Sequence, residues 1–408
     1  MDQSPSQAAS LRNTPFPHFV SAQTADFFAY NMLTVAVGWQ VYDLTRSALS
    51  LGLVGLAQFL PQFLLTLVVG HVADRYERRR VVMLSQGVLL CVCVVLALGS
   101  LTHSLTETAM LVCAAAMGGA RAFVHPTMSA YLPTLVETRL LPRALALSAS
   151  ARQTGIIIGP ALGGALYAAG AATVYITSAT AFLLSIVTLS RIRASCPVGR
   201  REPLTLGYIL GGIAYIRSKS EVLGAISLDL FSVLLGGATA LLPLFARDIL
   251  NVGPLGLGLL RAAPAVGALS MSLYLARVPM TRAAGLKMFA AVAIFGLSTI
   301  VFGLSHSFAL SLAALIVLGA SDMISVVVRS SLVQLETPDT MRGRVSAVNS
   351  VFIGTSNQLG EFESGVTAAW FGAAPAVVLG GVCTLLVVVV WMRLFPALRD
   401  RQSLCHGG

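Results

Sequence analysis

Charged side chains are scarce in this chain of 408 residues. Lys, Arg, Asp and Glu make up 11% of the sequence and hydrophobic residues 56%, whereas soluble domains carry about 25% charged residues. So few ionised groups cannot cover the surface of a soluble domain of this size. The composition therefore excludes an ordinary soluble protein and predicts a membrane protein that crosses the bilayer several times.

The sequence also lacks the patterns of cofactor-dependent and ATP-driven proteins. Its six cysteines show neither a disulfide framework nor metal-ligand spacing. It contains no Gly-x-x-x-x-Gly-Lys-Ser/Thr loop, no His-Glu-x-x-His pair and no Gly-x-Ser-x-Gly turn. We therefore expect no cofactor, no metal and no enzymatic activity, and an ATP-driven pump would need a separate subunit.

Twelve apolar segments are present, and about 20 apolar residues suffice for one membrane-spanning helix. They begin near Phe19, Leu49, Val81, Thr108, Ala144, Thr173, Val222, Leu255, Leu286, Phe308, Val345 and Ala374. A linker rich in Arg, Pro and Gly separates six segments from the other six. We predict an all-α fold with two pseudo-symmetric six-helix halves, residues 18–190 and 221–395. Cytoplasmic segments would cover 1–17, 191–220 and 396–408.

The excess of positive charge reflects topology. Of the 27 Lys and Arg residues, only Arg46 and Arg247 lie in loops on the side opposite the termini, and four lie inside predicted helices. The other 21 lie in segments on the same side as both termini. Because basic residues are enriched in cytoplasmic loops, we expect both termini in the cytoplasm, an inner-membrane location and no nucleic-acid partner.

The two halves carry related segments about two hundred residues apart. Gly155, Gly159 and Gly163 recur at every fourth residue of an apolar run. At a shift of 201 their counterparts are also small residues: Ser356, Gly360 and Ser364. Such spacing places small residues on one helix face and lets a second helix approach closely. Two related halves with a site between them are typical of secondary transporters.

The segment after the second predicted helix combines a carboxylate with a cluster of Arg. It reads Gly70-His-Val-Ala-Asp74-Arg75-Tyr-Glu-Arg78-Arg79-Arg80. It resembles the Gly-x-x-x-Asp-Arg-x-Gly-Arg-Arg loop of the major facilitator superfamily, with Glu77 in place of the second Gly. In that family the loop latches the halves in one access state. The resemblance therefore implies a gating role for five residues: Gly70, Asp74, Arg75, Arg78 and Arg79. The alternative is that these charges only set topology.

Further motifs narrow the resemblance. The run from Gly155 through Gly159, Pro160, Gly163 and Gly164 is similar to a motif found mainly in exporters of the superfamily. Other segments resemble its enterobactin-exporter-like, multidrug efflux branch: Leu228-Asp229-Leu-Phe, Thr337-Pro-Asp339 and Ser356-Asn357-Gln-Leu-Gly360. The resemblance implies a proton-coupled exporter of siderophore-like or drug-like amphiphilic small molecules, acting by alternating access as a monomer in the bilayer. An importer and a non-transporting membrane sensor or partner protein are the alternatives.

Eight ionisable residues inside the predicted helices are candidates for proton coupling or for lining a cavity. They are Asp26, Arg121, Asp229, Arg261, Asp322, Arg329, Glu361 and Glu363. A charge at the centre of a spanning helix costs about 2.5–3.5 kcal/mol on insertion scales. Each of these side chains should therefore face the bundle interior, water or a partner of opposite charge.

Two interpretations of these charges remain open. Asp26 and Asp229 differ by 203 in number, close to the repeat shift, so they are expected at equivalent places in a transport cavity. They could instead form permanent pairs that only fix packing, Asp26 with Arg121 and Asp229 with Arg261. Glu361 and Glu363 lie about 200° apart around a helix. Only one of these two carboxylates can therefore face the cavity.

Overall fold

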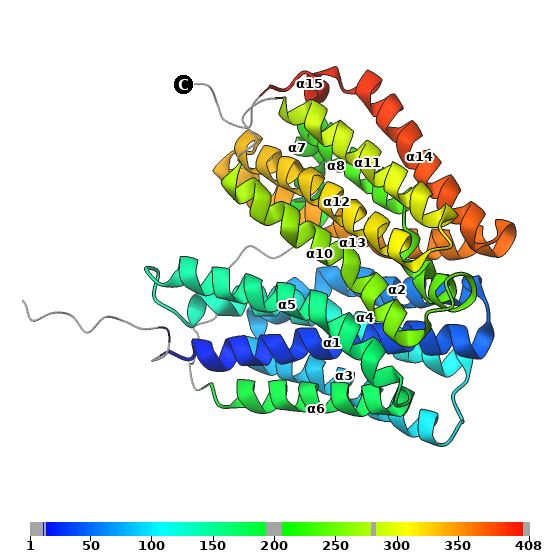
Figure 1. Cartoon of the computed structure of the whole chain (residues 1–408). Coiled ribbons are helices and arrows are strands. Elements are labelled where there is room, and N and C mark those ends of the chain that lie inside the picture. Colours follow the sequence, from blue (N-terminus) through cyan, green and yellow to red (C-terminus); the bar gives the residue numbers. More distant parts are fainter. Residues whose placement is uncertain (1–10, 12–13, 193–205, 279–282, 403–408) are drawn as a thin grey trace, which may run out of the picture.

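The computed structural model describes residue 11 and residues 14–192, 206–278 and 283–402. Those residues form helices joined by short connections, as the apolar runs predict, and the all-α prediction is confirmed. The first half contains α1 Phe16–Thr45, α2 Ala48–Arg75, α3 Arg78–Leu101, α4 Glu107–Tyr131, α5 Leu141–Tyr167 and α6 Ala171–Ser190. In Figure 1 these helices lie together in the lower part of the molecule.

The second half repeats this plan with more breaks in the backbone. It contains α7 Leu206–Ser218, α8 Ser220–Leu235, α10 Gly253–Arg277, α11 Ala284–Leu304, α12 Phe308–Glu336, α13 Asp339–Phe371, α14 Ala373–Leu394 and α15 Pro396–Arg399. After α8 the chain continues through three short turns: η3 Ala238–Leu241, α9 Leu242–Leu244 and the π-helix η4 Phe245–Ile249. A further short turn, η2 Leu132–Thr134, follows α4. In Figure 1 the second half lies above the first.

Nine helical segments of the described residues are long and apolar enough to cross a membrane, and one of them runs from Ser220 to Ile249. The three other long helices are α1, α5 and α13. All three helices line the space between the halves and carry polar or small residues there, such as Asn31, Pro160 and Gln358. All twelve predicted starts lie within long helices.

The small residues of α5 allow α1 to pack closely against it. A Cβ atom added to Gly159 would lie 2.7 Å from Cβ of Asn31, and one added to Gly155 would lie 2.6 Å from Cβ of Phe27. The counterpart in the second half is α13 on α8, where a Cβ on Gly360 would lie 2.9 Å from the carbonyl oxygen of Val233. The predicted motif therefore serves close helix packing within each half.

Gly164 and Gly365, which directly follow the small-residue repeats of α5 and α13, face the other half. A Cβ on Gly164 would lie 2.3 Å from the carbonyl oxygen of Pro254 in α10, and one on Gly365 would lie 2.5 Å from Cα of Gly52 in α2. Helix α5 thus packs on α10, and α13 packs on α2. The two contacts are related by the same shift of 201 residues. Between them the halves enclose a space that polar side chains line.

Candidate functional site

A cavity of about 410 Å³ lies between the two halves. Its volume falls within the range of about 300–1,000 Å³ that small-molecule sites occupy. Its polar lining residues come from both halves: Tyr30, Asn31, Thr34, Gln58, Thr239, Arg261, Gln358 and Glu361. A single cavity therefore offers one cation, one carboxylate and several neutral hydrogen-bonding groups among apolar side chains.

Arg261 and Glu361 provide the charges of this central cavity. The Arg261 guanidinium donates a 2.8 Å hydrogen bond across the interface to the Thr34 carbonyl oxygen of α1. Glu361 lies against α2, where a Cβ on Gly55 would be 3.0 Å from its Oε2 atom. Among the described residues no carboxylate oxygen lies within ion-pair distance of Arg261. Both side chains therefore have capacity left for a ligand.

Only one of the two neighbouring glutamates lines this cavity. Glu363 points away from Glu361 around α13 and accepts a 2.7 Å hydrogen bond from the Thr367 hydroxyl. The geometry agrees with the angular argument from the sequence and assigns the cavity position to Glu361.

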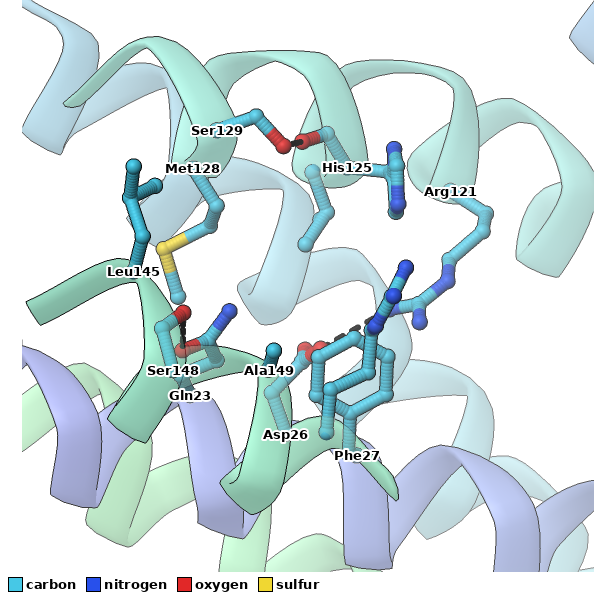
Figure 2. A pocket seen from close by; sticks show the side chains of 12 residues that line it. Gln23, Asp26, Phe27, Arg121, His125, Met128, Ser129, Leu145, Ser148 and Ala149 are labelled. Atoms are coloured by element: carbon cyan, nitrogen blue, oxygen red, sulfur yellow. Dashed lines mark hydrogen bonds and ion pairs between the residues drawn. The ribbon is translucent and has the colours of Figure 1, made fainter. Parts of the chain in front are cut away.

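A second pocket, of about 170 Å³, lies within the first half between α1, α4 and α5. Figure 2 shows Arg121 and His125 projecting from α4 toward Asp26 and Phe27 of α1. Apolar groups of Val124, Met128, Leu145 and Ala149 complete the wall, together with Gln23, Ser129, Ser148 and Arg152. His125 and Arg152 are exposed, so this pocket is open to the surface, and it lies nearer to Phe16, the first residue of α1, than the central cavity does.

Asp26 is bound by neighbours on two helices. The Arg121 guanidinium lies 2.8 Å from Oδ2 of Asp26, and the Gln86 amide donates to Oδ1 at 3.1 Å. Ser185 of α6 donates in turn to Gln86 at 3.0 Å. The carboxylate is 1% exposed, so this network compensates a deeply buried charge and joins four helices.

The corresponding carboxylate of the second half has a different partner from the one expected. Asp229 pairs with Arg329 of α12 at 2.6 Å, so the expected pair with Arg261 is wrong. Helix α12 packs beside α8, whereas Arg261 on α10 reaches across to the first half. Asp322 lines the same small pocket as Asp229. Two carboxylates therefore line one pocket, and the Arg329 guanidinium contacts one of them, Asp229.

Ion pairs join the halves at the end of α1 that is farthest from the N-terminus. Arg247 of η4 donates to Asp43, and Tyr42 donates to Asp248. Arg46 lies 3.4 Å from Asp248. Sequence reasoning assigned these residues no role, although Arg46 and Arg247 stood out as the two basic residues of the opposite loops. We name these five residues the outer cluster, and they join the halves beyond Gly38, the last residue of α1 that lines the central cavity.

We expect Asp43→Arg to open the outer cluster. The new side chain would face Arg247 with a like charge, and each exposed ion pair contributes about 0.2–1 kcal/mol. Loss of the two ion pairs of the cluster, about 0.4–2 kcal/mol in all, should therefore change the ratio of closed to open outer ends by roughly 2-fold to 30-fold. Spin labels at Leu49 and Asn251, in a variant without native cysteines, would report the change as longer distances.

The compensating variant provides the control for this prediction. Asp43→Arg combined with Arg247→Asp restores opposite charges and should restore the short distances. Glu137→Arg alters an ion pair with Arg139 inside the first half and should leave them unchanged. Unaltered distances in Asp43→Arg would show that the outer cluster does not hold the halves together.

Comparison with known proteins agrees with this architecture. The profile of the transmembrane secretion effector family, within the major facilitator superfamily, matches residues 5–404. The chain belongs to this family. It is a multi-pass membrane transporter and not an enzyme.

Curated relatives and solved structures cover almost the whole chain. The enterobactin exporter EntS of Citrobacter koseri is 26% identical over 381 residues, which is 93% of this chain and 91% of the relative. EntS of Escherichia coli strain K12 is 24% identical over 384 residues, 94% of this chain and 92% of the relative. A bacterial homologue of ferroportin in an inward-facing state has a TM-score of 0.74 at 15% identity and covers 96% and 100% of the two chains. A bacterial homologue of the lysosomal transporter Spinster has a TM-score of 0.72 at 13% identity and covers 94% and 96%.

The motif loop of this transporter family lies between α2 and α3. Gly70, Asp74 and Arg75 belong to the last turns of α2, and the side chain of Asp74 lies outside what the structure describes. Arg78 donates to the Ala130 carbonyl oxygen at 3.0 Å, and Arg79 donates to the Ile192 carbonyl oxygen. These contacts lie within the first half, at the ends of α4 and α6, where the helix dipole favours cations.

Glu77 stands where the superfamily loop has its second Gly, and it has its own contacts. Its carboxylate lies 3.0 Å from Arg79 and 2.8 Å from Arg80. The substitution thus adds a local ion-pair cluster to the loop. The latch between halves remains a prediction.

Proposed function

We propose that the protein is a proton-coupled exporter of amphiphilic small molecules in the inner membrane, active as a monomer with both termini in the cytoplasm. The observation that carries the proposal is the central cavity, which holds Arg261 and Glu361 and has the outer cluster beyond one end. The positive-inside distribution of basic residues supports a position of that end outside the cytoplasm. The names of the EntS relatives suggest siderophore-like substrates.

Alternating access provides the mechanism. A substrate enters the central cavity from the side of the termini while the outer cluster holds the opposite end shut. The halves then rock about two contacts, that of α5 with α10 and that of α2 with α13. This motion breaks the outer cluster and releases the substrate outside. Because the cluster consists of exposed pairs of modest energy, a bound substrate can supply the free energy needed to open it.

Asp322 is our proposed proton site. Asp229 and Asp322 line one small pocket, and Arg329 forms an ion pair with Asp229; among the described residues no cation lies within ion-pair distance of Asp322. One of the two carboxylate charges therefore remains uncompensated in the bilayer unless a proton binds. A proton taken from the outer side and released inside would favour return of the empty transporter.

Flux measurements in proteoliposomes test the proposal. Purified protein would be reconstituted and offered catecholate siderophores, macrolides and amphiphilic dyes, with and without a pH gradient. Asp322→Asn is expected to abolish gradient-driven accumulation while substrate exchange continues, because the amide keeps hydrogen bonding but cannot cycle a proton. Glu361→Gln, measured in parallel, examines the other unpaired carboxylate.

Glu363→Gln is the matched control, since Glu363 lies outside the central cavity and should retain gradient-driven flux. If both Asp322→Asn and Glu361→Gln still use the pH gradient, the proton-coupled mechanism is wrong. Wild-type protein that binds these compounds without moving them would support the sensor alternative. Accumulation in the opposite direction would support an importer.

A further inference from the structure

Arginines from three other elements contact α1 at regular intervals along its length. Arg121 of α4 contacts Asp26 at 2.8 Å, and its guanidinium carbon lies 4.3 Å from the centre of the Tyr30 ring. Arg261 of α10 contacts Thr34. Asp26 and Thr34 are eight residues apart, which corresponds to about 12 Å along a helix.

The next arginine lies one similar step farther along. Arg247 of η4 pairs with Asp43, and its guanidinium carbon lies 5.6 Å from the centre of the Trp39 ring. Nine residues separate Thr34 from Asp43, or about 13 Å along α1. Cations therefore follow one helix from the pocket of the first half, through the central cavity, to the outer cluster.

Arg152 adds a cation at the accessible end. It lines the first-half pocket together with Arg121 and His125 and is exposed there. The only carboxylate in that pocket belongs to Asp26, which Arg121 and Gln86 already satisfy. Among the described residues, no carboxylate lies within ion-pair distance of Arg152. The pocket therefore has an excess of positive charge.

Aromatic and apolar groups stand beside these cations. Phe27 lines the first-half pocket and Tyr30 the central cavity, and Arg121 lies over both rings, at 5.1 and 4.3 Å. The Arg121–Tyr30 contact thus joins the two cavities. Guanidinium groups bind carboxylates through paired hydrogen bonds and also stack on aromatic rings. The combination suits a flat apolar body that carries an acidic group.

We propose that Arg152, Arg121, Arg261 and Arg247 form a track that binds aromatic organic anions and passes them along α1 toward the outer cluster. We name these four residues the arginine track. The inference rests on the proposed export function and specifies its substrate class. The acidic group first binds at Arg152 beside Arg121. It then reaches Arg261 in the central cavity, and finally competes with Asp43 for Arg247, which opens the outer cluster.

Three probes of one shape test the charge preference: 2-naphthoate, 2-naphthamide and 2-naphthylmethylammonium. Dissociation constants would be measured with the full-length protein in nanodiscs, with empty nanodiscs subtracted. We expect wild-type protein to bind 2-naphthoate at least about tenfold more tightly than the amide, since a hydrogen bond to a charged group is worth that ratio or more. The ammonium probe should bind most weakly.

Arg152→Gln should remove most of the preference for 2-naphthoate and leave 2-naphthamide binding unchanged. Arg121→Lys keeps the charge beside Asp26 but loses the planar fork, so it too should weaken 2-naphthoate selectively. Arg143→Gln is the matched control, because Arg143 is exposed on the same helix α5 but lines neither cavity. Glu361→Gln should tighten 2-naphthoate, since an ionised Glu361 opposes an anion at Arg261.

Several outcomes would overturn the arginine track. They are equal affinity for acid and amide, tighter binding of the ammonium probe, absence of saturable binding, or a preference that survives Arg152→Gln and Arg121→Lys. Unchanged 2-naphthoate binding in Glu361→Gln would remove Arg261 from the track. Gradient-driven flux of a neutral dye tests the proposed function separately. Gradient-driven flux of the dye together with equal binding of 2-naphthoate and 2-naphthamide would refute the arginine track alone. Preferential binding of 2-naphthoate without any gradient-driven flux would refute the transport proposal alone.

Discussion

Arg329→Met is expected to lower the free energy of unfolding by about 3–5 kcal/mol, because it leaves a buried carboxylate without its partner. Asp229 is 5% exposed and Arg329 is 4% exposed, so water cannot replace the lost 2.6 Å contact. Asp322 lines the same pocket and adds a second negative charge. Equilibrium unfolding of the purified protein in detergent would measure the loss.

A double substitution measures the contribution of the Asp229–Arg329 ion pair separately from that of its surroundings. Asp229→Asn alone leaves Arg329 unpaired and should also destabilise the protein, whereas Asp229→Asn with Arg329→Met should recover most of the loss. Arg399→Met is the control, since Arg399 pairs with Asp400 on the exposed surface and such pairs contribute little. Equal stability of Arg329→Met and wild type would show that this pair does not hold α8 to α12.

The helices could be predicted from the sequence because apolar runs of sufficient length have only one stable form in a bilayer. Length and mean hydropathy alone do not identify α1, α5 and α13 as membrane-spanning helices. In these helices polar side chains face a cavity and small residues face another helix. The repeat of small residues compensated for this weakness. It indicated that Gly159 and Gly360 lie in close contacts, which both halves show.

The partners of the buried charges were harder to predict. The sequence identified Asp229 as a costly charge, but its partner depends on which helices are neighbours, and Arg261 was the wrong choice. The outer cluster depends on contacts between residues about two hundred positions apart, such as Asp43 with Arg247. Unequal distribution of basic residues marked Arg247 as unusual, but only the fold brings it to Asp43.

Other close helix contacts could not be predicted from the repeat of small residues. A Cβ on Gly267 of α10 would lie 1.9 Å from the carbonyl oxygen of Ile316, and one on Gly319 of α12 would lie 1.9 Å from that of Pro264. These two glycines belong to different helices, and each packs against the backbone of the helix that carries the other. A motif search along one helix cannot detect a contact that two helices share.

Gly159→Leu is expected to be among the most damaging substitutions in the first half. Its Cβ would lie 2.7 Å from Cβ of Asn31 and 3.6 Å from the carbonyl oxygen of Phe28, and the rest of the side chain needs still more space. Inserting atoms into a packed interface typically costs about 1–3 kcal/mol and occasionally more. Helix α1 would have to move away from α5.

Movement of α1 would affect transport as well as stability, because α1 carries Tyr30, Asn31 and Thr34 of the central cavity. We therefore expect loss of folded protein, and in any folded fraction a flux well below wild type. Gly87→Leu is the matched control on α3, where an added Cβ would meet no atom within 4 Å. Thermal unfolding and flux should both be close to wild type for Gly87→Leu. If Gly159→Leu matched that control in both measurements, the close packing of α1 on α5 would not be required for the fold or for the cavity.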